Sequence, residues 1–372
     1  MMNRSIYVIV WRIVFAASVM VMMVSALWAG LLRIGWALPL SSVAGMHGQL
    51  FIGGMLGTVI GLERAIAIGR SWAFAGPILT LLGGLGLLAG LPMTFSALLI
   101  SGGSLGLLVI FALLLKRQPA RFLITMALGA LAWFGGNLLW LSGQPLAVAS
   151  LWWVGFLTLT IFGERLELGR LRQLPTRAFW SFSLSVCLLG LGLIWGLFDY
   201  INGSRITGTG LLGSGLWLLT YDIGRRTIHR PGLPRFSAAC MLSGSAWLAF
   251  GGLLMTIVGG TYGGLLYDAV LHSIFVGFVF AMIFGHAPII IPALLNLPVR
   301  FSGWTYVPLG LLHLSLLLRV AGDLLPVIEW RRWGGMLNAV SILVYLFMTA
   351  IIIVVSMRQR SLTVMSVTNE IT

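Results

Sequence analysis

The stretch TFSALLISGGSLGLLVIFALLL, residues 94–115, carries no charged side chain and is followed at once by Lys116 and Arg117. An uncharged helical run of this length matches the hydrocarbon thickness of a bilayer. Similar runs fill the rest of the chain, which is 59% hydrophobic and only 9% charged. Because so few charges cannot cover a surface exposed to water, a soluble globular enzyme is excluded.

Apolar runs bounded by charges, Gly and Pro predict an all-α, polytopic membrane protein of about twelve transmembrane helices. The connections are short, so we expect one transmembrane domain over residues 1–372 and no soluble domain. Similar Gly- and Arg-rich ends of the second and sixth spans suggest internal four-helix repeats. The predicted spans are residues 7–31, 40–62, 72–91, 94–115, 122–142, 146–163, 178–199, 205–222, 237–260, 266–292, 303–325 and 335–357.

The positive charges give these spans a direction. If the N-terminus is cytoplasmic, seventeen of the 23 Lys and Arg residues fall on the cytoplasmic side, four on the outer side and two within spans. Cytoplasmic loops are enriched in Lys and Arg, so we expect both termini in the cytoplasm and the chain in the inner (plasma) membrane. The net charge of +14 is scattered over short loops, which argues against nucleic acid and leaves membrane lipid as the expected surrounding.

Four of the five histidines fall within predicted spans, and only His229 lies in a loop. An ionisable side chain in a bilayer is costly and marks a functional candidate. His47 and His272 enter from the outer side, roughly 10 Å and 9 Å deep at 1.5 Å per residue. An iron porphyrin bound on both faces requires two imidazoles at one level, so we expect these two to ligate a heme. The alternative is that each histidine only hydrogen-bonds a neighbouring helix.

Small and acidic neighbours fit this expectation. Gly45 and Gly48 beside His47, and Gly277 after His272, would leave room for a macrocycle. Asp268, four residues before His272, would accept its other ring N–H and fix the tautomer.

Arginine is rare on the outer side, so each one there requires a reason. Arg331 and Arg332 lie between the last two spans, where they would hold heme propionates by bidentate hydrogen bonds. Arg319 lies toward the outer end of its span. Its alternative role is an i,i+4 ion pair with Asp323.

Two further histidines lie deeper. His313 is roughly 15 Å from the inner boundary and would join the outer site or line a channel to it. His286 is roughly 21 Å deeper than His272, near the level of Glu63 and Glu164. A histidine with two carboxylates would bind a metal ion such as copper or relay protons, unless both carboxylates pair with neighbouring arginines.

The histidine at the start of the second span (MHGQLF, residues 46–51), the histidine early in the tenth and the Arg-Arg pair before the twelfth resemble the catalytic subunit of heme–copper oxidases and nitric oxide reductases. By that resemblance His47 and His272 would ligate a low-spin heme, and Arg331 and Arg332 would hold its propionates. The sixth and seventh spans, however, contain no histidine, so the binuclear site of those enzymes is not expected.

The chain also resembles the NnrS family, twelve-span proteins of the bacterial nitric oxide response that are described as containing heme and copper. The similarity is carried by His272, Gly277, Met282, Gly285 and His286, and by LRV at residues 318–320. It implies that His47, His272, His286 and His313 are metal ligands. It also implies a low-spin b-type heme, copper as a further candidate metal, and nitric oxide or another diatomic molecule as ligand.

Three functions follow, and they differ in what supplies the chemistry. The first is a heme protein that handles nitric oxide or electrons; with no Gly-x-Ser-x-Gly, P-loop, Cys-x-x-Cys or His-Glu-x-x-His, its chemistry would come from the metal, and no catalytic residue is assigned. The second is a cofactor-free transporter with Glu63, Glu164 and His286 as its proton or ion site. The third is a membrane scaffold, which the short loops favour least.

Overall fold

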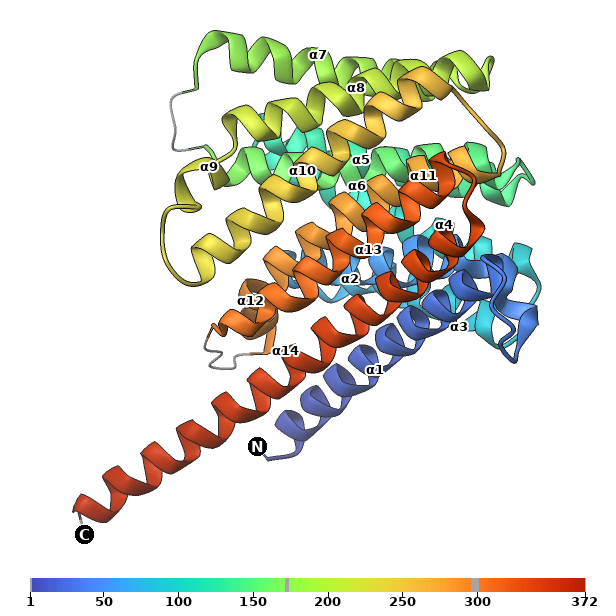
Figure 1. The fold of residues 1–372 in the computed structure, drawn as a ribbon. Helices are drawn as coiled ribbons and strands as arrows, with labels where there is room; N and C mark the ends of the chain where they lie inside the picture. The colour runs from blue at the N-terminus through green and yellow to red at the C-terminus, as the bar shows by residue number, and fades with distance from the viewer. Residues whose placement is uncertain (1, 171–173, 296–300, 372) are drawn as a thin grey trace. The chain divides into compact units, whose positions relative to one another are not determined.

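The computed structural model describes the backbone of residues 2–170, 174–295 and 301–371, and the side chains of residues 14–170, 174–290 and 301–356. This part of the chain is predominantly helical and contains no β-strand (Figure 1). The α-helices are α1 Met2–Arg33, α2 Gly57–Ile68, α3 Ala75–Leu88, α4 Met93–Arg117, α5 Arg121–Leu141, α6 Leu146–Leu168, α7 Thr176–Trp195, α8 Tyr200–Tyr221, α9 Gly224–Thr227, α10 Leu233–Val258, α11 Leu265–His272, α12 Ala281–Leu295, α13 Tyr306–Leu324 and α14 Ile328–Ile371.

Eleven helical segments among the described residues are long and apolar enough to cross a membrane. The protein is therefore a polytopic all-α membrane protein. Eleven of the twelve predicted spans correspond to these segments, while the cytoplasmic placement of the termini stays a prediction. The predicted span 40–62 begins with a short 3₁₀-helix, η1 (Ser41–Met46), before the longer helix starts.

The predicted span 205–222 is present as helix α8, but it is less apolar than the other eleven. Its glycines explain this composition. A Cβ at Gly208 would lie 2.6 Å from the backbone N of Thr256 in α10, and one at Gly210 would lie 2.6 Å from the backbone N of Leu189 in α7. Small residues let membrane helices approach closely, so α8 is selected for packing between two helices rather than for contact with lipid.

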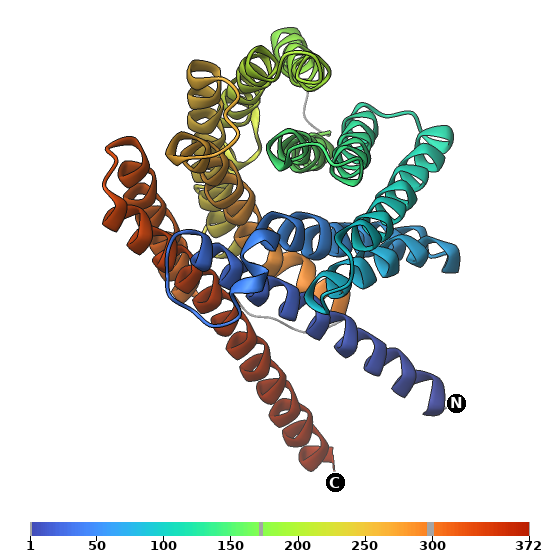
Figure 2. The same ribbon diagram turned by 90° about the vertical axis from the view of Figure 1, so that its right-hand side faces the viewer.

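The chain divides into two compact units. Unit 1 comprises Met1–Glu167 and Leu193–Tyr200, and unit 2 comprises Leu168–Gly192 and Ile201–Thr372. Within unit 1, α3 packs on α4, and α4 packs on α5. Within unit 2, α13 and α14 form an antiparallel hairpin, and α14 continues well past its partner (Figures 1 and 2).

Two of the long helices contain a π-helical segment, and each segment follows a candidate histidine. The segment η2 (Gln49–Leu56) begins two residues after His47, and η4 (Ser273–Phe280) begins directly after His272. A π-turn is rare and occurs often at functional sites. Both histidines therefore lie where the regular helical geometry is interrupted.

Gly208→Ala should destabilise the protein, because its new methyl group meets the backbone of α10 and cannot be accommodated by rotating a side chain. We expect a loss of about 1–3 kcal/mol, measured by thermal unfolding in detergent. Gly310→Ala on α13 is the matched control, since a Cβ there meets no other atom within 4 Å. Equal melting temperatures for the two variants would contradict the proposed packing role of α8.

Candidate functional site

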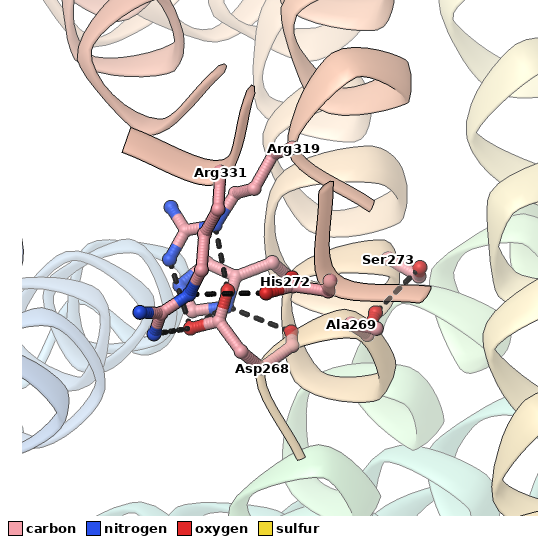
Figure 3. A network of polar contacts seen from close by, with 7 residues as sticks. Asp268, Ala269, His272, Ser273, Arg319 and Arg331 are labelled. Carbon is pink, nitrogen blue, oxygen red and sulfur yellow. Dashed lines mark hydrogen bonds and ion pairs between the residues drawn. The ribbon is translucent and has the colours of Figure 1, made fainter. Parts of the chain in front are cut away.

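The most extensive buried ion cluster among the described residues of unit 2 is centred on Asp268, in the first turn of α11. Arg319 of α13 donates to both carboxylate oxygens, from Nε at 2.8 Å and from Nη2 at 2.9 Å (Figure 3). Both side chains are about a tenth exposed or less. This bidentate contact replaces the i,i+4 pair of Arg319 with Asp323 that the sequence offered as an alternative.

A second pair adjoins the first. Arg331, in the first turn of α14, places Nε 3.0 Å from Oδ1 of Asp323 and Nη2 3.5 Å from Oδ1 of Asp268. The Asp323 side chain is fully buried. Two carboxylates thus face two guanidinium groups, and because the charges balance, burying the cluster avoids an uncompensated ion.

Two glycines allow the hairpin to bring its arginines together. A Cβ at Gly334 of α14 would lie 2.5 Å from the backbone N of Arg319, and one at Gly322 of α13 would meet the backbone N of Arg331. Any larger residue at either position would push the two helices apart. The close approach of α13 and α14 is therefore a condition for the cluster.

His272 lies directly on this cluster, although the hydrogen bond of its ring is to the backbone of Asp268 rather than to the predicted carboxylate. Its Nδ1 is 3.0 Å from the backbone O of Asp268 and 3.3 Å from the carboxylate Oδ1 of the same residue. Since a carbonyl oxygen can only accept, Nδ1 carries the proton, and in the neutral ring Nε2 carries the lone pair. This is the tautomer that binds a metal through Nε2, with a carboxylate behind the ring.

His47 belongs to unit 1 and is oriented in a similar way. Its Nδ1 is 2.7 Å from the backbone O of Ala26 in α1, and the edge of its ring contacts Phe51. A Cβ at Gly30 would lie 2.8 Å from the ring carbon Cε1. Gly30, which sequence reasoning missed, therefore makes room for the imidazole.

The remaining two histidines of the spans differ from each other. His286 has Nδ1 2.8 Å from the backbone O of Met282, so its neutral ring also carries the lone pair on Nε2. His313 instead accepts a hydrogen bond at Nδ1 from the indole of Trp247, at 3.1 Å. Its Nε2 is then the protonated nitrogen, and this hydrogen bond must break before either nitrogen of the neutral ring can bind a metal.

Two other predictions concern Gly277, which was expected to leave room for a heme, and Arg332, which was expected to bind a propionate. The space beside Gly277 is not left open, because Trp247 and the Leu316 side chain fill it. Arg332 pairs with Glu329 at 2.9 Å, within the first turn of α14. Glycine in an apolar helix marks close packing here rather than room for a ligand.

In unit 1, Glu63 and Glu164 both pair with Arg64, at 3.5 Å and 2.5 Å. This is the arrangement that the sequence offered as the alternative to a site with His286, which lies in unit 2. Among the residues whose side chains are described, no three His, Cys, Asp or Glu groups come together as a metal site. A heme needs no such cluster, since one or two axial ligands hold its iron.

Fold and ion cluster together define a multi-pass helical membrane protein with a buried, charge-balanced histidine site. The family model "Domain of unknown function (DUF8744)" matches residues 12–355, and the chain belongs to that family. The comparisons with curated proteins and with solved structures found no match.

Arg319→Met should destabilise the protein by about 3–5 kcal/mol, because it leaves the Asp268 carboxylate buried without its bidentate partner. The double variant Asp268→Asn with Arg319→Met should regain part of that loss, since no carboxylate then lacks its partner. Thermal unfolding of the four proteins of this double-mutant cycle measures the coupling. Arg332→Gln is the control, because its partner Glu329 is largely exposed and such pairs contribute about 1 kcal/mol or less. Similar losses for Arg319→Met and Arg332→Gln would contradict the assignment.

Proposed function

We propose that the protein is a heme-binding integral membrane protein and that Nε2 of His272 is an axial ligand of the iron. The observation that supports this proposal is the orientation of the ring: Nδ1 faces both the backbone and the carboxylate of Asp268. A carboxylate behind an imidazole fixes the tautomer and raises the basicity of the ligating nitrogen. Bound heme would supply redox chemistry and diatomic-ligand binding, while the protein supplies the ligand and its orientation.

The surrounding charges support the same role. Arg319 holds Asp268 through two hydrogen bonds, so the carboxylate keeps its place beside the ring. Arg319 and Arg331 are thus positioning residues of His272. For a propionate, Arg332 is the better candidate, because its partner Glu329 is the most exposed member of these ion pairs.

His47 is the second proposed ligand. Its Nδ1–H faces the backbone O of Ala26, which leaves the lone pair on Nε2 as in His272. That both histidines ligate one low-spin b-type heme stays a prediction from the sequence. His286 carries the same tautomer and is the remaining candidate for a copper ligand.

The resemblance to the NnrS family supports the finer proposal that the heme acts in the nitric oxide response of a bacterial inner membrane. Nitric oxide or another diatomic molecule would then be the ligand. The alternative is a cofactor-free transporter that uses Glu63, Glu164 and His286. The pairing of both glutamates with Arg64 gives that alternative a charged site in unit 1.

Absorption spectroscopy tests the heme proposal. Protein purified from cells supplied with a heme precursor should show a Soret band, and His272→Gly should lose most of its bound heme or change its spectrum. Added imidazole should restore the band of His272→Gly, because it replaces the missing ligand without repairing a folding defect. His229→Ala, in the loop before α10, is the control and should keep the parent spectrum.

Two results would reject the proposal. A colourless parent protein with intact helical circular dichroism would favour the transporter. An unchanged spectrum and heme content in His272→Gly would remove His272 as a ligand.

A further inference from the structure

Unit 1 contains buried polar atoms that meet no hydrogen-bonding partner within the described part of the chain. Six of them lie on helices α2, α5 and α6: the amide Nδ2 of Asn137, the indole Nε1 of Trp133 and of Trp152, the hydroxyls of Thr158 and Thr160, and Nε of Arg64. The side chains of Asn137, Trp133 and Thr160 are almost completely buried. Polar groups in protein interiors are nearly always hydrogen-bonded, so these atoms require water where protein offers nothing.

Helices α5 and α6 are in contact at several levels, and α2 joins them at one of these. At the first level, Gly136 of α5 contacts Trp153 of α6, and the Trp153 indole donates to Oδ1 of Asn137 at 2.9 Å. This hydrogen bond fixes the amide and leaves its Nδ2 without a partner among the described residues.

At the next level, Trp133 of α5 stacks on Phe156 of α6, with ring centroids 4.8 Å apart. The same indole fills the space beside Gly57 of α2. Further along, Thr160 packs against Gly129, where a Cβ would lie 3.0 Å from the hydroxyl. Helices α5 and α6 therefore pack along one line, and α2 joins them at Gly57 and, through Arg64, at Glu164.

Helical spacing puts the residues of this line about one turn apart on each of the two helices. Gly129, Trp133 and Asn137 follow one another at i,i+4 on α5, and Thr160 and Glu164 do so on α6. Four residues of an α-helix rise about 6 Å, which is about the span of one water molecule that makes two hydrogen bonds. Single waters can therefore bridge successive groups.

The line ends at charged side chains that reach the surface. Glu164 pairs with Arg64, and Glu63 approaches the same guanidinium from α2. The Glu63 side chain is 31% exposed and the Glu164 side chain 24% exposed. Arg165 and Glu167 are their electrostatic neighbours.

We propose that unit 1 contains a water-mediated proton path between α2, α5 and α6, from Asn137 past Trp133 and Thr160 to Glu164. Waters and the Thr160 hydroxyl both donate and accept, so they pass a proton on. Trp133 and Asn137 only hold waters in line, because an indole and an amide nitrogen donate without accepting. Glu164 receives the proton at the charged end, where Arg64 holds its carboxylate.

Proton flux into liposomes tests the path. With the purified full-length protein, a pH-sensitive dye inside the vesicles and an imposed potassium diffusion potential, the parent should conduct protons. Thr160→Val and Glu164→Gln should each reduce the flux at least tenfold. Thr160→Val is the decisive variant, because its hydroxyl has no protein partner among the described residues, and a merely structural role predicts no loss on its removal.

Two controls match these variants. Thr207→Val replaces a buried threonine of α8 whose hydroxyl donates to the backbone O of Gly203 at 2.9 Å. Glu329→Gln replaces a carboxylate of an exposed ion pair on α14. Both should conduct like the parent.

Hydroxyl-radical labelling with mass spectrometry detects the water directly and does not depend on flux. Trp133 should be labelled at least several-fold more than Trp217, although both indoles are buried, because the Trp217 N–H is satisfied by the backbone O of Ala178. The proposal is overturned by labelling of Trp133 that does not exceed that of Trp217. It is equally overturned by a parent that conducts no protons, or by flux that persists in Thr160→Val or Glu164→Gln.

Discussion

The free energy cost of a charge in apolar surroundings governs how the helices of each unit are tied together. Asp268 is buried in α11, and an isolated carboxylate there would be unfavourable by several kcal/mol. Arg319 of α13 and Arg331 of α14 compensate it, so three helices meet at one residue. The same requirement joins α2 to α6 in unit 1 through Arg64 and Glu164. The buried ion pairs of both units therefore hold neighbouring helices in register.

Much of the fold could be predicted from the sequence, because a bilayer demands long uncharged runs and short charged connections. Helix α8 is the span for which hydropathy is least informative. Its span was located from its ends, but its glycine, serine and threonine content reflects packing between α7 and α10, which a hydropathy pattern does not measure. Division of the chain into two compact units likewise depends on contacts between helices that are distant in sequence. Orientation in the membrane rests on the distribution of Lys and Arg alone.

The site was predictable where its contacts lie within one helix. The proximity of the Asp268 and His272 side chains follows from their i,i+4 spacing, and in the structure Nδ1 of His272 lies 3.3 Å from Oδ1 of Asp268. Helical spacing also offered Arg319 with Asp323, but Arg319 binds Asp268 of α11, and Asp323 pairs instead with Arg331 of α14, which two glycines bring close to α13. The partner of His313, the Trp247 indole, lies 66 positions away and leaves no signal in the sequence. Gly277 was interpreted as space for a macrocycle, yet the same indole fills that space.

The π-helices Gln49–Leu56 and Ser273–Phe280 also affect how relatives of this chain should be compared. A π-turn accommodates one residue more than an α-turn. Residues before the π-turn therefore face a different direction around the helix axis from the residues that regular α-helical spacing would align with them after it. A relative that has lost the extra residue would keep a membrane-length helix but rotate its histidine by roughly 100° against the remainder of that helix. Alignments within the family therefore need to allow a single-residue gap in each of these two segments. A relative whose segment has the same number of residues, rather than the same hydropathy, would be expected to orient its imidazole as this chain does.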